Sequence, residues 1–302
     1  MRDGQPSRTA TVVAALRGYA RYLPAPLCDC GDPYGVALAG QPYVALDALL
    51  SFSPAARSLF FHRPSAWLYN ATAAHVLRTI AIDDAVKSFT NSNGTQVLIM
   101  GAGMDARALR LHVKAPHMIW FEIDVPASQA AKCGALATID KGSSRPDVRY
   151  VAHNFESDSE AQLRIKLTDA GLDVTKPVLT ILEGVVMYLT EAAVDSTFKM
   201  LHDMTCKGSQ VVISHIPPNG LPSTPWSVNF WLPRWFKYAF GESLVFCGWK
   251  PGRSMASWFD SRGWSLVWHK DYGDVARGVG CSHGIVASVA GDFQRVALVT
   301  RK

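Results

Sequence analysis

The chain has 302 residues, of which 48% are hydrophobic and 18% charged, and its formal net charge is +5. This length and composition predict a globular protein with one large domain, or one domain with an extension. The mild, scattered charge does not indicate a nucleic-acid partner, the longest apolar stretch (residues 178–189) is too short to cross a bilayer, and no secretory signal is expected at the N-terminus.

Six cysteines in a long chain favour reduced thiols and a cytoplasmic protein. Cys28 and Cys30 have the spacing of half a metal site. No second Cys or His pair with ligand spacing lies near them, so no metal site is expected.

Residues 1–92 are expected to be helical, because Thr11–Tyr22 and Ala66–Phe89 carry apolar residues at three- and four-residue spacing. Proline and glycine residues between residues 24 and 42 predict loops between these two helices. We therefore expect a helical N-terminal extension ahead of a core domain at residues 93–302.

From residue 95 short apolar runs alternate with stretches of helical spacing. Strands are predicted at residues 96–100, 118–122, 148–152, 178–182, 210–214, 264–269 and 295–300. Helices are predicted at residues 104–112, 126–137, 159–170 and 190–205. This alternation predicts an α/β fold with a doubly wound, mostly parallel sheet, whose ligands lie beyond the carboxyl ends of the strands where strand order reverses.

Residues 216–258 interrupt this pattern and are rich in proline, glycine and aromatic residues. Seven of the nine tryptophans lie between Trp226 and Trp268. They are either the packing of an irregular lobe or, in part, the lining of an apolar substrate pocket under a lid. Substitution of Trp231 or Trp235 separates the two, because a pocket residue affects turnover and a packing residue affects folding. A membrane-surface patch would need a basic amphipathic helix, which is not found there.

The residues after the first predicted strand carry the strongest functional signal. Gly101 and Gly103 follow an apolar strand and precede helical spacing, which brings bare backbone and helix N–H groups close to a ligand, with Asp105 in the same loop. Glu122 and Asp124 end the next apolar run, and such carboxylates suit the hydroxyls of a ribose. A nucleoside-containing cofactor is therefore predicted, although the same loop also fits a dinucleotide fingerprint.

Three further groups narrow the choice of cofactor. Arg78 could clamp a carboxylate bidentately, or could be a surface arginine near acidic neighbours. Asn154 and Phe155 end a strand and suit an adenine, or Asn154 could simply cap the strand end. Glu183 lies within an apolar run, where an unpartnered carboxylate is costly, so a functional role is favoured.

These motifs, in this order, resemble the leucine carboxyl methyltransferase family, and in particular its bacterial branch of S-adenosylmethionine-dependent O-methyltransferases. The similarity runs from Ser7 to Trp264. It rests on the following segments: Arg78-Thr79…Asp83-Asp84, Gly101-Ala102-Gly103-Met104-Asp105-Ala106-Arg107…Arg110-Leu111, Phe121-Glu122-Ile123-Asp124-Val125-Pro126, Asn154-Phe155 and Glu183-Gly184-Val185-Val186-Met187-Tyr188-Leu189.

The resemblance implies a seven-stranded Rossmann-like class I methyltransferase core, with residues 1–92 as a cap over the cofactor and substrate site and 216–258 as a substrate lobe. It also implies S-adenosyl-L-methionine as cofactor. Two residues depart from the family pattern, since Asn154 replaces an aspartate and Ala106 a threonine. The resemblance implies that Arg78 holds the methionyl carboxylate and that Gly101 and Gly103 shape the loop beneath it. It also implies that Asp124 binds the ribose hydroxyls and that Asn154 and Phe155 bind the adenine. Glu183 would lie near the amino group and the sulfonium.

The acceptor is expected to be a small apolar molecule rather than a protein, methylated on a carboxylate or a hydroxyl. A carboxylate needs no general base, whereas a hydroxyl benefits from one. His215 and, second, His153 are candidate bases, although for either histidine a structural role is favoured. Tyr188 could orient the acceptor oxygen or simply pack. The alternatives are a non-methylating cyclase, isomerase or binding protein, carboxyl methylation of a protein C-terminus, and a Rossmann-type oxidoreductase that would leave Arg78 and Glu183 without a role.

Overall fold

The apolar runs predicted as strands lie side by side in one sheet. The computed structural model describes residues 7–61, 67–139, 146–155, 157–217, 248, 254–282 and 294–302. Within them the strands are β1 (Gln96–Met100), β2 (Ile119–Asp124), β3 (Asp147–Ala152), β4 (Val178–Leu182), β5 (Gln210–His215), β6 (Trp264–Asp271) and β7 (Arg295–Arg301).

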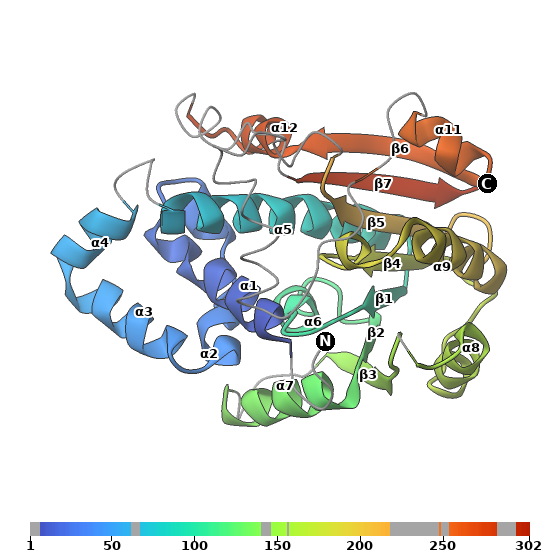
Figure 1. Cartoon of the computed structure of the whole chain (residues 1–302), viewed down its shortest axis with the longest axis horizontal. Coiled ribbons are helices and arrows are strands. Elements are labelled where there is room, and N and C mark those ends of the chain that lie inside the picture. The colour runs from blue at the N-terminus through green and yellow to red at the C-terminus, as the bar shows by residue number, and fades with distance from the viewer. Residues whose placement is uncertain are drawn as a thin grey trace.

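The strand order is β3-β2-β1-β4-β5-β7-β6, and Figure 1 shows this stack from β6 at the top to β3 below. Strands β1 to β5 pair in parallel, and β7 runs antiparallel between β5 and β6. Strand order reverses between β1 and β4, which are neighbours, so the chain leaves them in opposite directions. The predicted doubly wound, mostly parallel α/β fold is confirmed, and its ligand-binding edge is at the ends of β1 and β4.

Both faces of the sheet are covered by helices, which is why every residue of β1 and β4 is buried and why these strands are continuous apolar runs. One face packs against α1, α5, α6 and α12, and the other against α8, α9 and α11. The helices are α1 (Arg8–Gly18), α2 (Gly35–Ala39), α3 (Tyr43–Phe52), α4 (Pro54–Phe61), α5 (Trp67–Asn91), α6 (Arg107–Leu111), α7 (Pro126–Ile139), α8 (Glu160–Asp169), α9 (Glu191–Met204), α11 (Met255–Asp260) and α12 (Tyr272–Gly278), with short 3₁₀ turns at Tyr19–Tyr22, Leu27–Cys30 and Val186–Tyr188.

The N-terminal extension is more helical than predicted. The prolines that predicted loops between residues 24 and 42 do lie outside the α-helices, as do Gly31 and Gly40, but short helices stand between and after them. Pro42 is the N-cap of α3, and Pro54 is the first residue of α4. Proline is well tolerated there because the first helical N–H groups have no intrahelical partner. The loop prediction therefore holds at the positions on which it rested, whereas the short helices α2, α3 and α4 were not predicted.

Helix α6 is shorter than the predicted span of 104–112. The Asp105 side chain accepts a hydrogen bond from the backbone N–H of Arg107 at 2.7 Å, and the Asp105 N–H donates to the Ala102 carbonyl at 2.8 Å. This Asx-type turn holds the chain out of helical geometry until residue 107. The glycine loop is consequently longer, and the helix behind it has only five residues.

The late aromatic region is described only in part. Residues 218–247 and 249–253 lie outside the described residues, and with them Trp226, Trp231, Trp235 and Trp249, so the substrate-lobe prediction is untested there. Trp258 and Trp264 are buried and pack edge-on against Phe198 of α9. For these two tryptophans the packing interpretation holds.

Among the described residues, no single helix is both long enough and apolar enough to cross a membrane. Helices α3 and α4 reach the required length only when taken together, and the chain bends by 113° between them.

Candidate active site

The glycine loop after β1 is held in place by the end of β2. The N–H groups of Gly101 and Ala102 both donate to the Ile123 carbonyl, at 2.9 and 3.0 Å, and the Gly103 N–H donates to the Asp124 carboxylate at 2.6 Å. Gly101 and Gly103 have φ values of +71° and +44°, which side chains disfavour. At Gly103 a Cβ would also lie 2.7 Å from the Cβ of Ala10 in α1, so the N-terminal extension is pressed against the loop.

The structure separates the two acids of β2. Glu122 is buried and forms an ion pair with Lys132 of α7, while Asp124 lies at the strand end and contacts the loop. Burial raises the pKa of Glu122 against the opposing charge of Lys132, and raises the pKa of Asp124 against hydrogen bonds from Gly103 and Val125. Asp124 is therefore the acid placed to meet a ligand, and Glu122 anchors α7 to the sheet.

Arg78 and Glu183 face each other across the point where strand order reverses. The Arg78 Nε donates to Glu183 Oε1 at 2.8 Å, which joins α5 to the end of β4. Arg78 is only 3% exposed, which excludes the surface-arginine interpretation. Gly184 follows with φ +66°, and a Cβ built there meets no atom of the described residues within 4 Å.

A buried charge cluster extends from this pair into the N-terminal extension. Arg107, which is 0% exposed, donates to three carboxylates: Asp83 at 2.8 Å, and Asp105 and Glu183 in closer contacts. The cluster consists of four arginines and four acids, namely Arg17, Arg78, Arg107, Arg110, Asp32, Asp83, Asp105 and Glu183. Because the charges balance, the cluster can remain ionised away from water.

The cluster also sets the protonation state of the site. Burial alone would raise the pKa of Glu183, but the charges of Arg107 and Arg78 outweigh it and hold that pKa well below its usual range. The same competition leaves the pKa of Asp105 lowered, again chiefly through Arg107. Glu183 is therefore a carboxylate at any physiological pH. In addition, Arg17 donates to the Met104 carbonyl at 2.6 Å, which ties α1 to the glycine loop.

The loop after β3 forms the far side of the same edge. The His153 N–H donates to the Asp124 carbonyl at 2.9 Å, which places residues 153–155 beside the glycine loop. Phe155 is 38% exposed and meets the His153 ring edge-on, with ring centroids 5.1 Å apart. An exposed aromatic ring beside Asn154 is a suitable surface for a planar base.

His215 ends β5, where its imidazole meets another imidazole. Its Nε2 lies 3.0 Å from the Nε2 of His269 in β6, and the two rings stack at a centroid distance of 5.1 Å. Burial, together with His269 and Arg295, lowers the pKa of His215 to about 3. Tyr188 lies in the turn that follows Glu183, and that segment is tied to β5 by a 2.8 Å hydrogen bond from the Gly184 N–H to Ser214 Oγ.

The buried His215 makes a specific prediction for the pH dependence of stability. Because its pKa is lower folded than unfolded, the unfolded chain binds more protons below pH 6.5, and stability is lost as the pH falls. At pH 5 the loss in the free energy of unfolding, relative to neutral pH, is about 2 kcal/mol. We expect His215→Gln to reduce the pH slope of the urea midpoint between pH 7 and 5, and substitution of the exposed His117 to leave it unchanged. An equal slope in the wild type and His215→Gln would contradict the shifted pKa.

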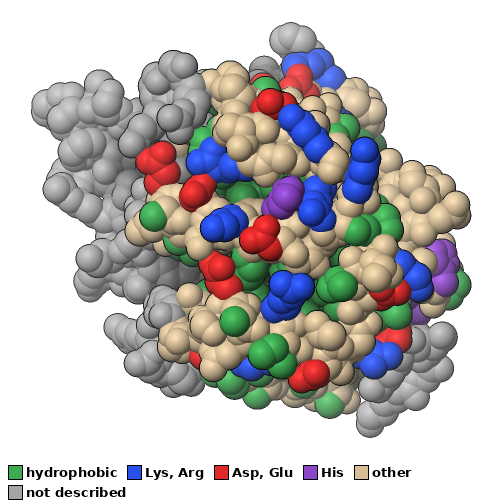
Figure 2. All heavy atoms as spheres, turned by 90° about the vertical axis from the view of Figure 1, so that its right-hand side faces the viewer, with side chains coloured by type: hydrophobic (Ala, Val, Ile, Leu, Met, Phe, Trp, Pro, Cys, Tyr) green, Lys and Arg blue, Asp and Glu red, His purple; other side chains and the backbone are tan. Residues whose placement is uncertain are grey.

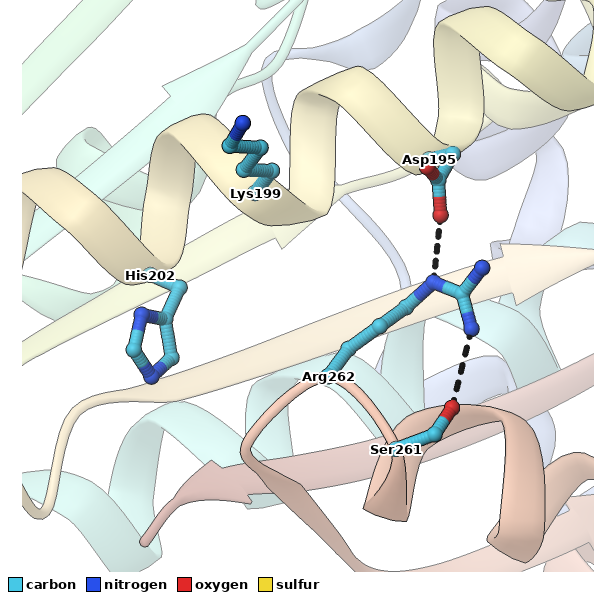
Figure 3. Close-up of a pocket in the computed structure, with 5 residues that line it drawn as sticks. All are labelled: Asp195, Lys199, His202, Ser261 and Arg262. Atoms are coloured by element: carbon cyan, nitrogen blue, oxygen red, sulfur yellow. Dashed lines mark hydrogen bonds and ion pairs between the residues drawn. The ribbon is translucent and has the colours of Figure 1, made fainter.

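A hollow of about 380 Å³ lies at the opposite edge of the sheet. Figure 3 shows its lining from α9 and from the turn between α11 and β6, and Asp195 pairs with Arg262 across it. Gly263 and β6 begin at the amino ends of the parallel strands, so this hollow is remote from the glycine loop. The lining residues are Asp195, Lys199, His202, Ser261 and Arg262. Figure 2 shows this side of the molecule with basic and acidic side chains interspersed.

Within the described residues, no group of three or more His, Cys, Asp or Glu side chains is arranged to hold a metal ion. The five cysteines that the structure describes, Cys28 and Cys30 among them, are free thiols.

Comparisons with known proteins agree with this geometry. A family model described as leucine carboxyl methyltransferase matches residues 10–202. A proposed S-adenosyl-L-methionine-dependent methyltransferase of Mycobacteroides abscessus is 29% identical over 273 residues, covering 86% of this chain and 83% of that protein. Another such protein, of Mycobacterium sp. (strain JLS), is 32% identical over 212 residues, covering 70% and 67%.

Solved structures share the fold at low identity. A proposed methyltransferase of Thermobifida fusca matches with a TM-score of 0.57 and 17% identity over 100% of this chain and 97% of that one. A DUF574 family protein of Streptomyces avermitilis also matches with a TM-score of 0.57 and 17% identity, over 96% and 97%.

The fold and the edge at β1, β2 and β4 define a class I methyltransferase that uses S-adenosyl-L-methionine. More closely, this chain belongs to the leucine carboxyl methyltransferase family, because the family model covers more than half of it. The family, fold class and cofactor predicted from the sequence are confirmed.

Proposed function

We propose that this chain transfers the methyl group of S-adenosyl-L-methionine to a carboxylate oxygen of a small apolar molecule. The observation that carries the proposal is the Arg78–Glu183 pair beside the glycine loop. A methionyl group bears a carboxylate and an ammonium, and this pair offers one partner of opposite charge to each. A nicotinamide dinucleotide has no comparable zwitterion.

The other residues at this edge fit the remaining parts of the cofactor. Asp124 retains lone pairs for the ribose hydroxyls, because each of its oxygens accepts one backbone N–H. Asn154 and the partly exposed Phe155 would hold the adenine. When bound, the cofactor supplies an electrophilic methyl group on a sulfonium. Glu122, enclosed with Lys132, has no place in this assignment.

The state of His215 favours a carboxylate acceptor over a hydroxyl. With a pKa of about 3 and its Nε2 against His269, this imidazole is a weak base at neutral pH. A carboxylate is already ionised and needs no proton removed, so positioning and exclusion of water supply the rate. Within this proposal His215 shapes the acceptor side of the site, and Tyr188 orients the acceptor oxygen. The free thiols favour a cytoplasmic location.

Two titrations and one product assay test the proposal. We expect S-adenosyl-L-methionine to bind with micromolar affinity in calorimetry, and NADH not to bind. Matched pairs of apolar carboxylic acids and the corresponding alcohols or phenols would then be screened for formation of S-adenosylhomocysteine. Turnover of the hydroxyl compounds alone would contradict the carboxylate assignment. Binding of the cofactor without turnover of any acceptor would favour the non-methylating alternative.

A further inference from the structure

The guanidinium of Arg78 is held at two of its three nitrogens. Its Nε donates to Glu183 at 2.8 Å and its Nη1 donates to Gln294 Oε1 at 3.0 Å. Nη2 is the nitrogen that neither Glu183 nor Gln294 holds. Because a guanidinium is rigid and planar, fixing two nitrogens fixes the direction in which the third points.

Gln294 is itself held by a buried tyrosine. The Tyr272 hydroxyl donates to the same oxygen, Gln294 Oε1, at 2.7 Å. Burial raises the pKa of Tyr272 and outweighs the lowering effect of the charge of Arg78 and of a hydrogen bond with Arg78, so the hydroxyl remains a donor. The Tyr272 hydroxyl and the Arg78 guanidinium therefore donate to the same amide oxygen, which keeps this oxygen beside Arg78. The amide contributes no charge of its own.

A neutral acceptor has a different effect from a second carboxylate. A carboxylate at this position would compete with an incoming anion for Arg78, whereas an amide oxygen orients the guanidinium and leaves its charge available. Glu183 is already shared with Arg107, so its charge is not spent on Arg78 alone. The arrangement suits an arginine that must accept an anionic ligand.

Tyr272 and Gln294 come from the C-terminal part of the chain. Tyr272 is the first residue of α12, which packs against α5, and Gln294 immediately precedes β7. Arg78 and Gln294 are 216 positions apart in sequence. Both partners lie beyond residue 202, where the match to the family model ends.

We propose that Tyr272 and Gln294 form a positioning bracket that aims the free edge of Arg78 at the carboxylate of the bound cofactor. This inference rests on the proposed role of Arg78. The bracket provides selectivity for ligands that carry the amino-acid carboxylate over ligands that end at the thioether. Tyr272 and Gln294 act through Arg78 and need not touch the ligand.

Two ligands that differ in the carboxylate test the bracket by calorimetry. S-Adenosylhomocysteine has the amino-acid group, and 5′-methylthioadenosine lacks it but retains the ribose and adenine. We expect Tyr272→Phe to weaken S-adenosylhomocysteine roughly 3- to 10-fold, the scale of one lost hydrogen bond, and to leave 5′-methylthioadenosine unchanged. Gln294→Leu should have a larger effect in the same direction, because it removes the acceptor of both donors.

Tyr19→Phe is the matched control, because it also removes one buried tyrosine hydrogen bond, to the Tyr43 carbonyl, away from Arg78. It should leave the affinity ratio of the two ligands at the wild-type value. The bracket is overturned if Tyr272→Phe leaves the affinity ratio of the two ligands unchanged, whether it weakens neither ligand or both equally. Failure of the wild type to prefer S-adenosylhomocysteine would instead overturn the role of Arg78, and the bracket with it.

Discussion

Arg107→Leu is expected to lower the free energy of unfolding by about 3–5 kcal/mol, the scale of removing one partner from a buried ion pair. The substitution leaves Asp83, Asp105 and Glu183 close together without the guanidinium that they share. Arg78 and Arg110 still compensate part of that charge, which is why the chain is not expected to lose its fold altogether. Urea denaturation followed by circular dichroism at pH 7 measures the effect.

Two variants show whether burial and shared geometry are responsible. Arg149→Leu removes a guanidinium from an exposed pair with Asp147, and the urea midpoint should stay at the wild-type value. Arg107→Lys keeps the charge but cannot reach three carboxylates with a planar fork, so its stability should fall between Arg107→Leu and the wild type. If Arg107→Leu were as stable as Arg149→Leu, the cluster would contribute nothing net to folding.

Much of the core domain could be predicted from the sequence because its central strands, β1 and β4 among them, are buried on both faces. Such strands are uninterrupted apolar runs, and β1 and β4 begin and end at the predicted residues. The N-terminal extension was harder, because α2, α3 and α4 are short, and α3 and α4 start at prolines, which otherwise mark loops. Local sequence alone does not distinguish the two uses of proline.

The candidate site was predictable where the signal is local, and not where it depends on pairing. Gly101 and Gly103 follow the apolar strand β1 and Asp124 ends β2, so position alone indicated their place at the edge of the sheet. The sequence could not separate Asp124 from Glu122, because the partner that removes Glu122 from the edge is Lys132, ten residues on. Nor could it link Arg78 to Gln294, since no periodic pattern relates residues in a helix and a distant loop.

Arg78 and Glu183 combine two tasks that are usually separate. They hold each other within the buried charge cluster, and the proposed function also requires each of them to hold one end of the methionyl group. The remaining partners of both residues, Gln294 for Arg78 and Arg107 for Glu183, let the pair stay ordered when a ligand takes up part of their bonding. Pre-ordering of this kind reduces the cost of fixing side chains on binding.

Arg78→Ala is expected to weaken S-adenosyl-L-methionine by roughly 2–3 kcal/mol, or about 30- to 150-fold, because it removes the charge-assisted bond to the carboxylate. A general loss of order at the site would also weaken binding, so the effect on S-adenosyl-L-methionine has to be compared with the effect on a ligand that lacks the carboxylate. The affinity for 5′-methylthioadenosine should be unchanged, since that ligand has no carboxylate. Asp124→Asn provides the opposite pattern, because weaker acceptance of the ribose hydroxyls affects both ligands alike. Equal weakening of the two ligands by Arg78→Ala would remove Arg78 from the cofactor site and leave it as part of the buried charge cluster alone.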